Sequence, residues 1–164
     1  MPSRVQDLIT LVEQGYRGPA WHGTTVRGAL RGVTALQALW RPGPGRHNIW
    51  ELALHIAYWK YAVTRRLLRA PLRGFPREGS DWIPARETTQ QAWKADVALV
   101  GQQHKLLIDA IRSLPVGRIN AKEGRRWTNA EQIVGVASHD LYHTGQIQLI
   151  KRLLPTRLPS DLPG

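Results

Sequence analysis

Apolar residues recur every three to four positions along most of the chain, and prolines and glycines interrupt them at intervals. This spacing predicts a first helix over about 3–14. It predicts a second over about 25–39, which two internal glycines weaken. The segment 41–45, Arg-Pro-Gly-Pro-Gly, cannot continue a helix, because a proline inside a helix removes a backbone donor and clashes with the preceding turn.

The clearest of the early helices is predicted over 49–68. Asn48 is a good N-cap residue, and Glu51 stands three residues later, as in a capping box. The segment is apolar over most of its circumference, so we expect it to be packed inside the protein. The following loop, 71–86, contains three prolines and Trp82, and we expect it to be a crossover connection or a lid.

Two more long helices are predicted in the second half of the chain. One begins at Thr88 or Thr89 and ends near Leu114. The other covers 128–154, where a T-x-x-E capping box begins the helix and a proline ends it. The linker between them, 115–127, is expected to hold a small hairpin or an irregular excursion.

Helical segments with few strand candidates predict an all-α fold, a four-helix bundle with a long crossover connection. At 164 residues, the chain has the length of a single domain, and we expect residues 1–164 to form one.

The composition limits the chemistry. The sequence contains no cysteine, so any metal ion must bind nitrogen or oxygen ligands, and disulfides and cysteine nucleophiles are excluded. No segment reaches the ~18 consecutive apolar residues typical of a membrane span. Arg4 and Asp7 interrupt the position where a secretory signal would be apolar. We therefore expect a cytoplasmic protein that does not bind membranes.

The formal net charge of +11 raises the question of a polyanionic partner such as nucleic acid. Arginines, however, occur in nearly every segment. Three of the most closely spaced, Arg65, Arg66 and Arg69, fall near the end of a predicted helix, where cations interact favourably with the helix dipole. This distribution favours a solvated surface over a nucleic-acid binding stripe.

Three histidines carry the most specific chemical signal. His139 and His143 are four residues apart on the last predicted helix, so both imidazoles point the same way, about 6 Å apart along the axis. Their face continues through Val136 and Ile150 and therefore looks inward. His55 lies in the apolar middle of another helix. A lone buried histidine is usually a hydrogen-bonded core residue, but three inward histidines on two helices predict a divalent metal site with an open coordination position.

The chain also resembles a known family. The segments 47–59, HNIWELALHIAYW, and 139–147, HDLYHTGQI, are similar to the two signature segments of the DinB-like (YfiT-like) metalloprotein superfamily. The resemblance covers about residues 25–154. It implies a four-helix bundle, often a homodimer, with a divalent metal on three histidines, which fall on His55, His139 and His143. Relatives include thiol-dependent transferases or isomerases and proposed metal-dependent hydrolases.

Other polar residues near the three histidines are assigned roles as hypotheses. Glu51, one turn before His55, is either a proton-transfer carboxylate or only the capping residue. Gln146, one turn after His143, either orients a water molecule or makes a simple polar contact. Asp140 is expected to point away from the metal. We expect nickel or zinc, with iron and manganese as alternatives, because all four accept imidazole.

Aromatic residues near the histidines, Tyr58, Trp59 and Tyr142, either line a substrate pocket or belong to the core. His47 is expected to be a loop residue outside the site. His22 and His104 have no partner at ligand spacing and are also left out.

Two functional hypotheses remain open. The first is a metal-dependent enzyme, a hydrolase or a thiol-dependent S-transferase, acting on a small-molecule substrate with a low-molecular-weight thiol as a possible cosubstrate. The second is a non-catalytic helical module, stabilised by metal, that binds a protein or nucleic acid through its basic surface. An open metal position facing a cleft would favour the enzyme.

Overall fold

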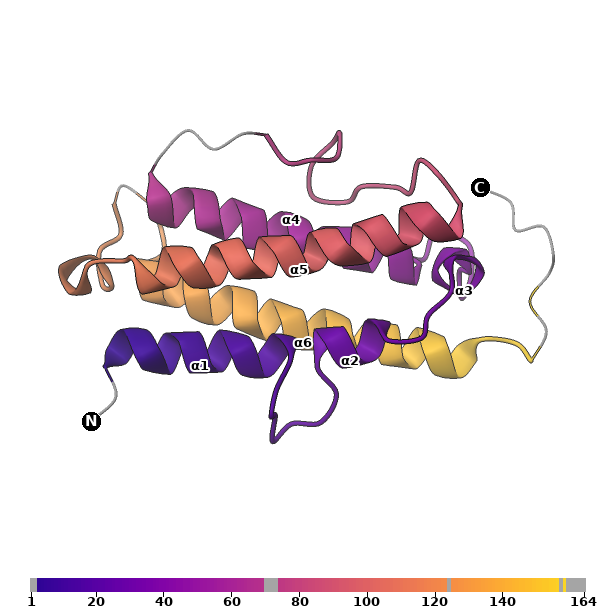
Figure 1. The fold of residues 1–164 in the computed structure, drawn as a ribbon, viewed down its shortest axis with the longest axis horizontal. Helices are drawn as coiled ribbons and strands as arrows, with labels where there is room; N and C mark the ends of the chain where they lie inside the picture. Colours follow the sequence, from indigo (N-terminus) through magenta and orange to yellow (C-terminus); the bar gives the residue numbers. More distant parts are fainter. Residues whose placement is uncertain (1–2, 70–73, 124, 157, 159–164) are drawn as a thin grey trace.

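The computed structural model describes residues 3–69, 74–123, 125–156 and 158, and within them the fold is entirely helical. Four long helices run alongside one another (Figure 1): α1 (Arg4–Tyr16), α4 (Ile49–Leu68), α5 (Gln90–Arg112) and α6 (Asn129–Leu153). Helix α1 packs against α5 and α6, and α4 packs against the same two helices, so the four close a bundle. The predicted all-α bundle is confirmed.

The long helices begin where polar side chains cap them. The Asn48 side chain accepts a hydrogen bond from the Glu51 backbone at 2.8 Å, and the Glu51 side chain accepts one from the Asn48 backbone. Thr128 and Glu131 form the same reciprocal pair at the start of α6. Both predicted capping boxes are therefore present, and Thr89 caps α5.

The first half of α4 is the most enclosed part of the fold. Every residue from Ile49 to Ala57 is buried. The helices α3 (Ala35–Leu39), α5 and α6 pack against α4, and the loop after α4 adds Ile83 to the same core cluster. A helix covered from several directions must be apolar on several sides, which is the pattern that the sequence shows.

The predicted single helix over 25–39 is wrong. The chain forms two short helices there, α2 (Val26–Leu30) and α3, because Gly32 between them has a φ of +74°, a left-handed conformation that breaks the helical run. Thr34 and Gln37 then form a capping box that starts α3 afresh.

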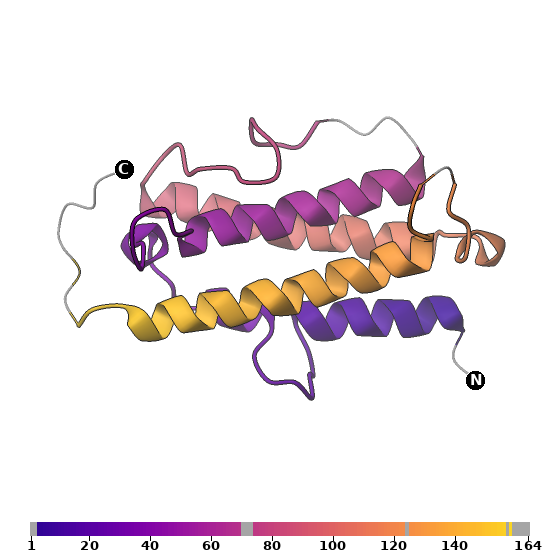
Figure 2. The same cartoon turned by 180° about the vertical axis from the view of Figure 1, so that it is seen from behind.

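Two other connections can be compared with the predictions from the sequence. The linker 115–127 contains a 3₁₀ helix, η1 (Val116–Arg118), and its described residues form no strand, so the suggested hairpin is absent there. In the crossover after α4, Pro71 lies outside the described residues, and the part from residue 74 onward runs back along α4 and α5 (Figure 2). Its placement puts Trp82 beside the predicted site.

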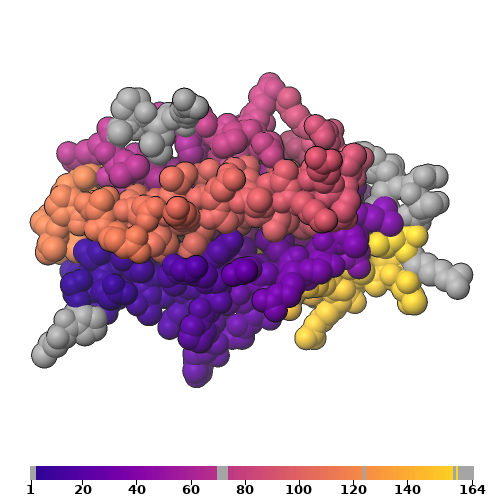
Figure 3. Space-filling model, viewed as in Figure 1, coloured from indigo at the N-terminus to yellow at the C-terminus, as the bar shows by residue number. Residues whose placement is uncertain are grey.

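The surface has one prominent projection. The loop 17–25 between α1 and α2 stands out from the body of the molecule (Figure 3), and Trp21 within it is fully exposed. Among the helices that the structure describes, none combines the length and the apolar character that crossing a membrane requires.

Candidate metal centre

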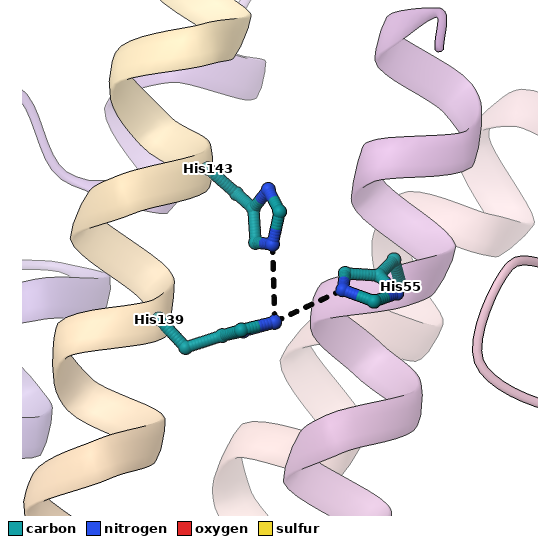
Figure 4. A group of neighbouring side chains, drawn as sticks. All are labelled: His55, His139 and His143. Carbon is teal, nitrogen blue, oxygen red and sulfur yellow. Dashed lines mark hydrogen bonds between the residues drawn. The ribbon is translucent and has the colours of Figure 1, made fainter.

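His139 and His143 project side by side from α6 toward α4 (Figure 4). Their Nε2 atoms are 3.0 Å apart, as the spacing of four residues on one helix allows. His143 is buried and His139 half-buried. The last helix therefore presents two ring nitrogens to the same point.

His55 completes the group from the opposite helix. It lies in the middle of α4, is 5% exposed, and its Nε2 is 3.0 Å from Nε2 of His139. Each of the three histidines offers a ring nitrogen within 4.8 Å of the other two. The predicted convergence of His55, His139 and His143 is confirmed.

The far side of two imidazoles is held by hydrogen bonds. Nδ1 of His55 lies 3.0 Å from the Asp81 carbonyl oxygen, and Nδ1 of His143 lies 2.6 Å from Oε1 of Gln146. Since both partners only accept hydrogen bonds, Nδ1 must carry the proton in each ring. The Nε2 lone pair is then free, and it points into the cluster, which is the tautomer that a metal ligand needs.

Burial keeps all three imidazoles uncharged. Desolvation, with repulsion from His143 and His55, lowers the pKa of His139 to about 3. Desolvation likewise lowers the pKa of His143 to about 4 and the pKa of His55 below its ordinary value. At neutral pH the cluster therefore presents neutral nitrogen donors without having to release protons first.

The separations suit a shared ion. Ligand nitrogens about 2.1 Å from one metal ion lie about 3.0 to 3.4 Å apart for angles between octahedral and tetrahedral values. Nε2 of His139 is 3.0 Å from Nε2 of both His55 and His143, and the three ring nitrogens lie within 4.8 Å of one another. Neutral imidazole nitrogens are ligands that divalent cations of the first transition row accept, so the donor set fits such an ion.

The crossover loop covers one side of the cluster. The Trp82 ring stacks on His55, with centroids 3.8 Å apart, and on His47, with centroids 3.6 Å apart. The neighbouring Asp81 accepts a hydrogen bond from Nε1 of Trp59 at 2.8 Å. His47 lies in the loop before α4, as expected, but its ring also stacks on Trp82, which covers the histidine cluster.

Glu51 is engaged by groups at the start of α4. Arg41 Nη1 donates to its carboxylate at 2.9 Å, and Nδ1 of His47 lies 3.0 Å from it. Burial alone would raise the pKa of Glu51, but these hydrogen bonds outweigh burial and lower it. Glu51 is thus an ionised capping residue that fixes His47, which is not one of the three converging histidines. Its suggested role in proton transfer remains a prediction.

Gln146 holds an imidazole in this structure, since its amide oxygen faces His143. A role in orienting water is not tested by this contact. Of the three aromatic residues considered for the pocket, Trp59 lies 6.0 Å from His139 and Tyr142 lies 4.9 Å from His143, measured between ring centroids. Tyr58 packs on Phe75 in the crossover loop, with centroids 5.5 Å apart.

A buried ion pair lies directly behind the cluster. Asp140, next to His139 in the chain, turns away from the three rings and pairs with Lys60 of α4. Both side chains are fully buried. The pair joins the two helices that carry the histidines, and Lys60 could not be predicted as its member from the sequence pattern.

The other side of the cluster opens to a groove. A cavity of about 860 Å³ lies between α4 and α6, and His139 is the only one of the three histidines in its wall. Since His55 and His143 are almost fully enclosed, the half-buried His139 marks the accessible side of the cluster.

The fold and the cluster define a class: a helical bundle in which three histidines from two helices meet in an arrangement that could hold a metal ion. Comparison with protein families is consistent with this. The model of the DinB superfamily matches residues 20–147, and the chain belongs to that superfamily. Searches of curated proteins and of solved structures returned no match.

Proposed function

We propose that this protein is a metal-dependent enzyme of the hydrolase or thiol-dependent transferase type, with His55, His139 and His143 as metal ligands. The observation that carries the proposal is the convergence of three Nε2 atoms beside an open groove. Three protein ligands leave coordination positions for water or substrate, which is typical of catalytic sites and not of closed structural ones.

A divalent ion bound there would supply Lewis-acid chemistry and lower the pKa of a bound water or thiol. The surrounding residues prepare the site for it. Asp81 and Gln146 fix the orientation of two ligand imidazoles, and Trp82 excludes water from the side next to His55. Nickel or zinc are the first metals to test, followed by iron and manganese.

Two carboxylates near the histidine cluster are candidates for proton transfer. Asp81 has its Oδ1 atom 3.3 Å from Nδ1 of His55 and is half exposed. The Glu51 carboxylate is buried and engaged by Arg41 and His47. The Asp81 carboxylate is nearer to the ligand set and freer to exchange protons with solvent, so it is the stronger candidate.

The first experiment is metal analysis of the purified protein. We expect about one divalent ion per chain, lost in His143→Ala and retained in the control His22→Ala, which changes a histidine on the projecting loop. Metal content that is unchanged in His143→Ala would remove the proposed ligand set. Ester and amide substrates, and electrophiles with added thiols, should then be tested with the metal-loaded protein.

The competing hypothesis, a metal-stabilised binding module, predicts a different outcome. Chelation would then lower the melting temperature, but no substrate or thiol would be turned over and the groove would have no ligand. The groove beside His139 favours the enzyme. The homodimer implied by the family resemblance is a separate proposal, and light scattering on the purified protein tests it.

A further inference from the structure

The groove between α4 and α6 has a distinctly apolar wall. Residues from both helices line it, and Trp127 at its end comes from the chain just before α6. Trp127 is 52% exposed and Val134 is 42% exposed, which is unusual for large apolar side chains on neighbouring parts of a surface. The surface therefore suits an apolar ligand, and the metal site lies at its His139 wall.

The groove also carries a cation. The Arg66 guanidinium lies over the Trp59 ring, 5.6 Å from its centroid, and forms no ion pair within the part of the chain that the structure describes. Arg4 lines the same groove. Its acidic lining residue, Glu131, already accepts hydrogen bonds from the backbone and hydroxyl of Thr128. With two arginines against one carboxylate, the apolar groove has a net positive charge at its rim.

Trp59 connects the cation to the histidine cluster. Its ring centroid is 6.0 Å from that of His139 and 5.6 Å from the Arg66 guanidinium. The Trp59 indole is itself fixed, because its Nε1 donates to Asp81. A ligand lying along Trp59 can therefore reach both His139 and Arg66 if it is a few bonds long.

We infer that the groove binds substrates with an apolar body and a carboxylate, the carboxylate pairing with Arg66 and the reacting group lying near His139. This inference rests on the proposed function and adds the class of substrate. Charge complementarity selects an acid over an alcohol or amine of the same length, and Trp59 and Trp127 contact the apolar body.

The test compares octanoate with octan-1-ol and octylamine by isothermal titration calorimetry on the metal-loaded protein. We expect octanoate to bind about fivefold more tightly than the alcohol, the gain that a solvent-accessible ion pair gives at most. Arg66→Gln should abolish this preference. Arg65→Gln, the neighbouring arginine that does not line the groove, should retain it.

A steric variant tests the location. A Cβ atom added at Gly135 meets no atom within 4 Å outside its own stretch of helix, and Gly135 lines the groove. Gly135→Leu should therefore fold and reduce octanoate affinity at least tenfold. Gly145→Leu adds the same bulk to α6 outside the groove, at a position where an added Cβ also meets nothing within 4 Å, and should leave binding unchanged.

Several results would overturn the inference. A preference for octanoate that survives Arg66→Gln would place the carboxylate elsewhere, for example on the metal. If Gly135→Leu changes the mass measured by light scattering but not octanoate binding, the groove is a contact between copies of the chain. Metal bound without octanoate binding refutes only this inference, whereas octanoate bound by a protein that takes up no metal refutes only the proposed function.

Discussion

Gln146 offers the most direct test of how the histidine cluster is organised. Its side-chain oxygen lies 2.6 Å from Nδ1 of His143, and the His143 side chain is buried. Gln146→Leu keeps the approximate size of the side chain but removes the acceptor. The buried Nδ1–H of His143 then has no partner, and the proton that fixed the tautomer is no longer held in place.

The expected loss follows from that single hydrogen bond. Leaving a buried donor unsatisfied costs about 1 to 3 kcal/mol, and removing the partner of a ligand imidazole typically weakens metal binding about 10- to 100-fold. Gln146→Glu should have the opposite effect, because a carboxylate makes the imidazole a stronger donor. The pKa of His143 is lowered to about 4. A carboxylate at position 146 can therefore raise this pKa while His143 stays uncharged at neutral pH.

The assay is competition for zinc against a chromophoric chelator, run at neutral pH on wild type and both variants. Gln148→Leu is the matched control, since Gln148 is on the same helix and donates to Thr24, far from the cluster in the sequence. If Gln146→Leu binds zinc as tightly as wild type while His143→Ala does not bind it, the orienting role assigned to Gln146 is refuted.

Two buried polar groups outside the histidine cluster, His104 and Lys60, should control how the fold responds to acid and to substitution. Burial lowers the pKa of His104 to about 4, so its contribution to stability is complete above pH 6.5 and is lost as the pH falls toward 4, by up to about 3 kcal/mol. His104→Phe keeps the ring stacked on Tyr16 and should lose that much less stability on acidification, as measured by urea unfolding; an unchanged pH dependence contradicts this. Lys60→Met leaves Asp140 as an unpaired buried charge and should cost about 3 to 5 kcal/mol, whereas Lys60→Met/Asp140→Leu should recover most of it. If Lys60→Met is as stable as wild type, Asp140 does not remain in the protein interior as an unpaired charge.

The long helices could be predicted because their signals are local. A cap residue, its partner three positions later and a proline or glycine at the end lie within one segment, and α4 and α6 begin at the predicted caps. The 25–39 segment has an equally apolar pattern, but its outcome depended on the conformation of Gly32. Periodicity records which side of a helix is apolar and contains no information on whether a glycine interrupts it.

The histidine cluster could be predicted for a similar reason, and its surroundings could not. Two ligands on one helix and a third in an apolar segment are visible in the sequence. The cover over them is not, because the contact between His55 and Asp81 joins residues 26 positions apart through a loop without periodicity. The stacking of His47 on Trp82 also depends on this loop, so it could not be predicted from the position of His47 before the helix.

The Lys60–Asp140 pair connects the stability of the bundle to the geometry of the histidine cluster. Ligands from α4 and α6 can converge only if the two helices keep a fixed register, and apolar contacts alone tolerate sliding. A shift of one turn, about 5.4 Å, would leave both buried charges unpaired, so the pair opposes such a shift. We therefore expect Lys60→Met/Asp140→Leu to fold stably yet bind zinc more weakly than wild type in the same competition assay. Equal affinity in a stable double variant would mean that side-chain packing sets the register without help from the charges.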